Sequence, residues 1–181
     1  MRKAEVLLAG LGGQGVQLAG DILARACTLA GRQVSVLPSY GAEARGTLIR
    51  TEVVIADEEI IYPGVLEPDI FVAFSQEAYD HFLPLIMPQT VIFYDSASVT
   101  PQEIRDGVTR QHAIPAMAAA AELGDAKAAN MIMLGALATA SNLVPQLELR
   151  QILSEGPSKR AETSIRALDK GMELAAGTVG R

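Results

Sequence analysis

A glycine-rich turn between a predicted strand and a predicted helix constrains the fold of this chain more than any other feature. The apolar run Glu5-Val-Leu-Leu-Ala9 predicts a buried parallel strand, and it stops at glycine. From Gln14 onward the apolar period is that of a helix, which Gly31 ends. The turn itself, Gly10-Leu-Gly-Gly-Gln-Gly15, fits the pattern G-x-G-x-x-G. A second strand over 33–37 completes a unit that favours a right-handed parallel crossover.

The rest of the chain continues this pattern and predicts an α/β fold, a three-layer Rossmann-like sheet that is mostly parallel. A short hairpin is expected, in which a strand over 48–55 turns at the acidic tip 57–59 and returns over 60–62. Further strands are expected over 70–74, 91–94 and, weakly, 108–114, with a helix over 76–87 interrupted near Pro84. After Pro115 the patterns predict C-terminal helices over 116–123, 127–141 and 146–153, and a fourth that begins at Ser158 as its N-cap.

The helix expected over 127–141 is apolar nearly all round, so all its sides must be covered. It could form a layer between the sheet and another subunit, or it could be a central core helix. Asn130 within it could cap or bond a neighbouring backbone group, and its position indicates no catalytic role.

Composition limits the function classes. The 181 residues are 49% apolar, which indicates a single domain over 1–181 with a sizeable core. A net charge of −6 without a Lys/Arg cluster argues against nucleic-acid binding. The most apolar stretch, 128–140, is shorter than the ~20 residues that cross a bilayer, and no signal peptide is visible. We therefore expect a soluble, cytoplasmic protein with no membrane partner.

The chain has one cysteine, Cys27, which cannot form an internal disulfide, an iron–sulfur cluster or a cysteine-based zinc site. Its place in a helical pattern indicates burial as a small apolar residue. His81 and His112 are far apart in sequence and lie in no metal-binding spacing. No metal site is predicted.

The glycine turn could bind an anion, because its backbone N–H groups can approach a ligand at a helix N-terminus. Gln14 could add an amide donor. Binding of NAD would need an acidic residue at the end of the second strand, where the chain has Leu37-Pro-Ser-Tyr40, and Glu43 comes several residues too late. Three readings stay open: close helix–strand packing only, binding of a phosphate-bearing group, or docking of another subunit.

The loop after the second strand is the most informative segment, because it combines Tyr40, Glu43 and Arg45 between glycines. Glu43 and Arg45 could pair, although exposed pairs contribute little. Arg45 could instead make paired hydrogen bonds to a phosphate, a carboxylate or a partner subunit. The alternative is a solvated loop.

Together these segments resemble the gamma subunit or gamma domain of 2-oxoacid:ferredoxin oxidoreductases. The glycine turn up to Val16 and the segment Pro38-Ser-Tyr-Gly-Ala-Glu-Ala-Arg-Gly46 carry the resemblance first. It continues through Ile61-Tyr-Pro63, Glu67-Pro-Asp69, Gln76-Glu-Ala-Tyr-Asp80 and Ala129-Asn-Met-Ile-Met-Leu-Gly-Ala136, and it covers nearly the whole chain. The acidic tip 57–59 before Tyr62-Pro63 looks most like the 2-oxoglutarate members. Thr47 stands where the family often has a second glycine.

The resemblance implies a subunit that is inactive alone. Such enzymes oxidatively decarboxylate a 2-oxoacid with coenzyme A and reduce ferredoxin. Thiamine diphosphate and magnesium are held by alpha and beta subunits, and iron–sulfur clusters by beta or by a delta ferredoxin-like subunit. No catalytic residue is therefore expected in this chain. The free-standing Rossmann-type nucleotide-binding protein and the purely structural subunit remain alternatives.

The resemblance also implies that this chain packs against alpha and helps to form the coenzyme A side of the site. The glycine turn and the loop after the second strand both follow carboxyl ends of strands, so we expect them at one edge of the sheet. The residues predicted to face the cofactor are Gly10, Gly12, Gly13, Gln14, Gly15, Ser39, Tyr40, Glu43, Arg45 and Gly46.

Overall fold

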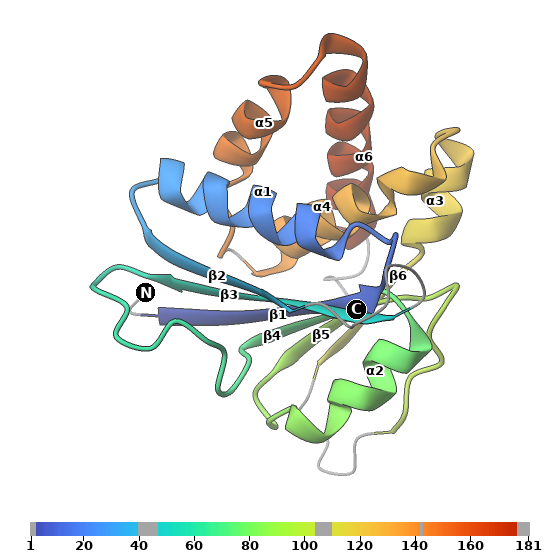
Figure 1. Ribbon diagram of the computed structural model, residues 1–181. Helices are drawn as coiled ribbons and strands as arrows, with labels where there is room; N and C mark the ends of the chain where they lie inside the picture. Colours follow the sequence, from blue (N-terminus) through green and yellow to red (C-terminus); the bar gives the residue numbers. More distant parts are fainter. Residues whose placement is uncertain (1–2, 40–46, 104–109, 142, 177–181) are drawn as a thin grey trace.

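The computed structural model describes residues 3–39, 47–103, 110–141 and 143–176 (Figure 1). Its centre is a sheet in the order β2-β3-β1-β4-β5-β6. β1, β4, β5 and β6 run parallel, and β3 runs antiparallel to both β1 and β2. The strands are β1 (Lys3–Leu11), β2 (Gln33–Ser39), β3 (Leu48–Ala56), β4 (Ile70–Ala73), β5 (Val91–Asp95) and β6 (Gln111–Ile114).

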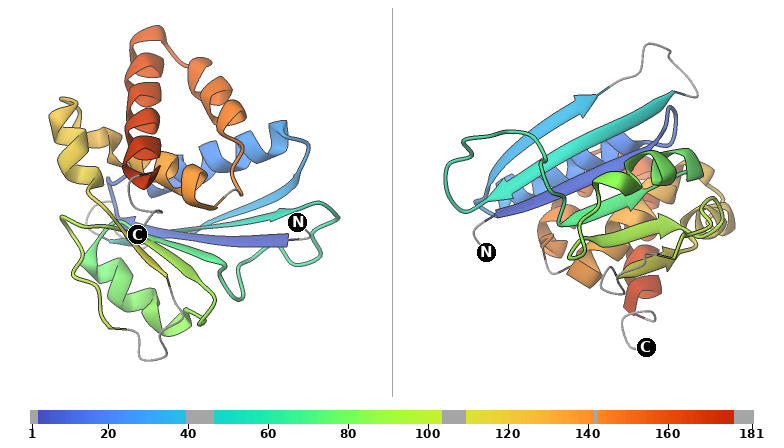
Figure 2. Two further views of the ribbon diagram at one scale, coloured as in Figure 1. Left: turned by 180° about the vertical axis from the view of Figure 1, so that it is seen from behind. Right: turned by 90° about the horizontal axis from the view of Figure 1, so that it is seen from below.

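The three layers expected from the sequence are present, but they are unequal. Most helices cover one face of the sheet, whereas α2 covers part of the other (Figures 1 and 2). The first layer holds α1 (Val16–Leu29), α3 (Ala116–Glu122), α4 (Ala129–Ser141), α5 (Gln146–Ser154) and α6 (Ser158–Ala176). α2 covers residues Gln76–Phe82 and is followed by a short 3₁₀ turn, η1 (Leu83–Leu85). A second 3₁₀ turn, η2 (Ala126–Ala128), precedes α4.

The antiparallel part of the sheet differs from the predicted hairpin. Residues 60–62 form no strand, and Ile61 is 96% exposed. The antiparallel partners of β3 are β1 and β2 instead. Because β3 is flanked on both sides, it has no free edge on which a returning strand could pair. The segment 57–69 is therefore a connection from β3 to β4.

α4 is a central core helix. Residues 129–138 are all buried, and α6, α1 and α3 of the same chain pack around it. Of the two interpretations of its apolar surface, the core helix is thus the one observed. α6 buries Ala161, Leu168 and Ala175 along one face, and Ile165 and Met172 are partly buried beside them. Pro157 rather than the predicted Ser158 occupies the cap position, since the Pro157 carbonyl accepts from the Ala161 N–H at 2.9 Å.

The crossing of α4 and α6 depends on two glycines. A Cβ atom at Gly135 would collide with the carbonyl oxygen of Leu168, and one at Gly171 would collide with the carbonyl oxygen of Ile132. The backbones of the two helices therefore approach each other more closely than any other residue type allows.

Cys27 is buried in α1, as predicted. Desolvation raises the pKa of its thiol to about 11, which leaves almost no thiolate at neutral pH. Cys27 is thus an inert core residue.

Candidate functional site

The glycine turn connects β1 to α1 at the carboxyl edge of the parallel strands. Gly13 and Gly15 have φ values of 102° and 75°, in the left-handed region that favours glycine. Gly10 allows close packing, because a Cβ there would collide with Phe74 at the end of β4. The predicted residues of the turn are therefore brought together where β1 and β4 end side by side.

Gln14 braces this turn from within. Its Oε1 accepts a hydrogen bond from the Leu11 N–H at 2.7 Å, and its Nε2 donates to the Phe74 carbonyl at 2.9 Å. The sequence predicted that Gln14 donates to a ligand, whereas the structure shows its amide joining the ends of two neighbouring strands.

Asn130, at the start of α4, holds the other side of the turn. It is 3% exposed, its Nδ2 donates to the Gly15 carbonyl at 3.1 Å, and its Oδ1 accepts from the Met131 N–H at 2.9 Å. The expectation that Asn130 bonds neighbouring backbone is confirmed. Any Cβ at Gly15 would collide with this amide.

Some N–H groups of the turn are already used by the fold. The Gly12 N–H donates to the Thr47 carbonyl at 3.0 Å, and the Gln14 N–H donates to the Leu11 carbonyl at 3.1 Å. α1 begins after Gly15 without a side-chain cap and without an acidic residue in its first turn. Gly13 is exposed beside this uncompensated helix N-terminus, where the dipole favours negative charge.

The second predicted connection leaves the same edge. Ser39, the exposed last residue of β2, pairs with Arg50, and Leu48 at the start of β3 pairs with Leu11. The expectation that both connections share one edge is confirmed for their described ends. Tyr40, Glu43, Arg45 and Gly46 lie outside the described residues.

The strand arrangement also bears on dinucleotide binding. In the dinucleotide fold the second strand lies directly beside the first, so that its end reaches the ribose. Here β3 separates β2 from β1. This separation and the lack of an acidic residue at the end of β2 both argue against NAD.

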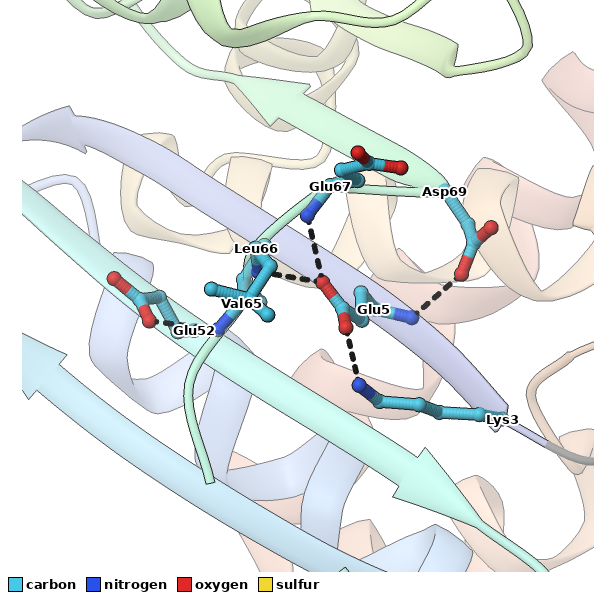
Figure 3. A network of polar contacts seen from close by, with 7 residues as sticks. All are labelled: Lys3, Glu5, Glu52, Val65, Leu66, Glu67 and Asp69. Carbon is cyan, nitrogen blue, oxygen red and sulfur yellow. Dashed lines mark hydrogen bonds and ion pairs between the residues drawn. The ribbon is translucent and has the colours of Figure 1, made fainter. Parts of the chain in front are cut away.

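Sequence reasoning missed two buried carboxylates. Asp95, 1% exposed at the end of β5, accepts from the Met117 N–H at 2.9 Å and from Ser98 Oγ at 2.7 Å. Glu5, 6% exposed in β1, accepts from the backbone of the β3–β4 connection (Figure 3). The sequence signal for both Glu5 and Asp95 was an acidic residue within or directly after an apolar run that predicts a buried strand.

Within the described ranges, no group of three His, Cys, Asp or Glu side chains could hold a metal ion. Over the same ranges, no helix is long and apolar enough to span a membrane.

Known proteins with similar sequences and structures identify the family of this chain. The family model described as pyruvate ferredoxin/flavodoxin oxidoreductase matches residues 5–174. The chain is 39% identical to 2-oxoglutarate synthase subunit KorC of Methanocaldococcus jannaschii, over 97% of this chain and 95% of that protein.

Two solved structures have the same fold. The first is 2-oxoglutarate:ferredoxin oxidoreductase from Magnetococcus marinus with 2-oxoglutarate, coenzyme A and succinyl-CoA bound, with a TM-score of 0.89 and 28% identity. The match covers 98% of this chain but 32% of that one, so this chain spans about a third of the longer polypeptide. The second is the gamma subunit of a keto/oxoacid ferredoxin oxidoreductase from Geobacter sulfurreducens, with a TM-score of 0.82, 30% identity, and coverage of 96% and 99%.

The chain belongs to the pyruvate ferredoxin/flavodoxin oxidoreductase family. Within this family it is a gamma-type subunit of a 2-oxoacid:ferredoxin oxidoreductase.

Proposed function

We propose that this chain is the gamma subunit of an enzyme that converts 2-oxoglutarate and coenzyme A to succinyl-CoA and carbon dioxide, with the electrons passing to ferredoxin. The 39% identity to a 2-oxoglutarate synthase subunit over nearly the full length supports this choice of 2-oxoacid. The likeness to an oxidoreductase structure that holds 2-oxoglutarate, coenzyme A and succinyl-CoA supports it as well.

Other subunits supply the reactive groups in this proposal. Alpha and beta subunits hold thiamine diphosphate and magnesium, and beta or a delta ferredoxin-like subunit holds the iron–sulfur clusters. One cysteine cannot bind a cluster that needs four thiolates, so this chain's residues do not fit that role. The complex works in the cytoplasm, and this chain contributes packing and one side of the coenzyme A site.

The observation that carries the coenzyme A role is the shared sheet edge. The glycine turn and the ends of the β2–β3 connection leave the sheet together, where ligands of open α/β sheets usually bind. Gly10 and Gly15 let the turn pack closely on Phe74 and Asn130, and Gly12 and Gly13 are the glycines proposed to approach the cofactor. Gly13 and the start of α1 offer positive partial charge. In this proposal Arg45 is the cation for the coenzyme A phosphates. The other residues of the coenzyme A side from this connection are Ser39, Tyr40, Glu43 and Gly46.

A substitution tests this assignment in the assembled complex. Arg45→Ala should raise the KM for coenzyme A about tenfold, as expected for the loss of one charge-assisted contact, while the subunits still assemble. Arg166→Ala, which removes an exposed arginine on α6, is the matched control and should leave the KM unchanged. An unchanged KM for Arg45→Ala in an intact complex would refute the role of Arg45.

A purely structural subunit is the second candidate. It is favoured by the use of the Gly12 N–H, the Gln14 amide and the Asn130 amide within the chain itself. In that case every substitution at this edge would change assembly or stability without a separate change in the KM for coenzyme A.

A further inference from the structure

The β3–β4 connection, residues 57–69, has no regular secondary structure, yet carboxylate side chains bond it to the sheet, and one of them, Glu5, is buried. Glu5 Oε2 accepts hydrogen bonds from the Leu66 N–H at 2.6 Å and from the Glu67 N–H at 2.9 Å (Figure 3). Lys3 Nζ bonds the other carboxylate oxygen of Glu5 at 2.5 Å. A buried carboxylate that accepts several hydrogen bonds fixes the groups that donate to it.

Two further carboxylates complete this anchorage. Glu52 Oε2 on β3 accepts from the Val65 N–H at 2.9 Å. Asp69 and Glu5 bond each other twice, with the Glu5 N–H donating to Asp69 Oδ2 at 2.8 Å and the Asp69 N–H donating to the Glu5 carbonyl at 2.9 Å. Three acidic side chains from three places in the chain thus anchor residues 65–69, the part of the connection that leads into β4.

The anchored segment presents large apolar side chains to solvent. Ile61 is 96% exposed, Leu66 65% and Tyr62 52%. The Tyr62 ring lies against Gly64, where a Cβ would be 3.0 Å from its Cε1. Single exposed apolar residues are common, but three within residues 61–66 of one anchored connection are typical of a binding surface.

The neighbouring sheet face is also open. Leu37 on β2 pairs with Glu52, so its side chain points to the face on which the connection lies. Leu37 is 41% exposed, and seen from below none of the described helices lies over β2 on this side of the sheet (Figure 2). Because the third layer is incomplete here, Leu37 extends the exposed apolar surface from Val65 and Leu66 onto β2.

The rim of this surface is acidic. A recess of about 270 Å³ is lined by Glu58, Glu59 and Lys3 beside Ile61 and Tyr62. The Lys3 ammonium is already paired with Glu5, so the carboxylates of Glu58 and Glu59 leave the recess acidic. Glu67 is a further exposed carboxylate on the connection. A partner that fits this surface is apolar at the centre of its contact and carries Lys or Arg side chains for the recess.

We infer that residues 57–69, together with the open face of β2, form the docking surface for a neighbouring subunit of the oxidoreductase complex with that apolar and basic character. This inference rests on the proposed function. A second copy of this chain fits less well, because a two-fold contact pairs this surface with itself, and both copies would bring the same excess of carboxylates to it.

The test uses this chain co-expressed with the proposed alpha and beta subunits and purified with them as a complex. In the double variant Ile61→Asp/Leu66→Asp, two exposed apolar contacts become charges of the same sign as the rim. We expect the dissociation constant for the partner subunits to rise at least about tenfold, as for the loss of central interface residues. The circular dichroism spectrum and Tm of the isolated variant should match those of the native chain, because both side chains are exposed.

Leu147→Asp is the matched control, since Leu147 is 73% exposed on α5 in the opposite layer. Native-like affinity of the double variant would overturn the inference, as would an equal loss for Leu147→Asp. A change in the dimerisation of the isolated chain, with partner binding intact, would overturn it in favour of a second copy. If the native chain binds none of the subunits, the proposed function itself fails, and this result is distinguishable from the others.

Discussion

At the scale of single residues, Gln14 links the glycine turn to the sheet through both ends of its amide. Gln14→Ala would leave the Leu11 N–H and the Phe74 carbonyl without these partners. Because unsatisfied, partly buried groups cost about 1–3 kcal/mol, we expect the free energy of unfolding to fall by that amount. Gln17→Ala, in the first turn of α1, should change it by less than about 0.5 kcal/mol. Chemical denaturation measures both, and equal stabilities would contradict the bracing role.

His112 gives the stability a dependence on pH. Its ring stacks on Phe93 with centroids 4.9 Å apart, and burial, with a smaller effect of Arg110, lowers its pKa below the ordinary 6.5. As the pH falls through 6.5, the unfolded chain takes up a proton that the folded chain resists. The free energy of unfolding contributed by this group is therefore present above pH 6.5 and declines below it.

The variant His112→Phe tests this dependence, because it keeps an aromatic ring over Phe93 without a titrating group. Denaturation curves between about pH 7.5 and about pH 5.5 should show a shallower loss of stability than in the native chain. A slope as steep as that of the native chain would mean that other groups cause the dependence.

At the scale of elements, the crossing of α4 and α6 holds the helical layer together. Alanine normally stabilises a helix relative to glycine by about 1 kcal/mol. At Gly135 and Gly171 the added methyl group would collide with backbone carbonyls, which cannot move aside as a side chain can. Each alanine variant should therefore destabilise the chain by about 2 kcal/mol or more.

Gly156→Ala is the control, because the nearest atom to its Cβ would be the Leu153 carbonyl oxygen at 3.7 Å, an ordinary contact. We expect this variant to differ from the native chain by less than about 1 kcal/mol. Thermal and chemical unfolding of the three variants gives the comparison. Native stability of both Gly135→Ala and Gly171→Ala would show that the helices can separate without cost.

Local sequence patterns predict most elements of this fold, because the spacing of apolar residues and the positions of glycine and proline are local properties. The strand 70–74, the break in the helix near Pro84 and the apolar helix after Lys127 all lie close to their expected bounds. The pairing of β3 was not predictable in this way. β3 pairs with β1 on one side and with β2 on the other, and this arrangement depends on the order of strands in the whole sheet.

The candidate site was also predicted only in part, because some of its features are local in the sequence and others are not. The glycines and the shared edge follow from a motif and from the direction of parallel strands. The partners of Gln14 and Glu5 do not, because each bonds backbone that lies about sixty residues away. A side chain with such distant partners cannot be assigned by neighbouring sequence.

At the scale of the whole molecule, the two faces of the sheet are covered unequally. One face carries nearly all the helices, and the other carries α2 and an anchored connection that exposes Ile61 and Leu66. This asymmetry agrees with a chain that functions within a larger assembly. The glycine turn then serves the proposed cofactor edge, and the β3–β4 connection serves the proposed subunit contact.

The most direct test of this account is ferredoxin reduction by the partner subunits, measured with and without this chain. With 2-oxoglutarate and coenzyme A present, we expect ferredoxin reduction only when this chain is added to the thiamine-bearing subunits, and none from this chain alone. Oxidation of a 2-oxoacid by the isolated chain, or full activity of the partner subunits without it, would contradict the account.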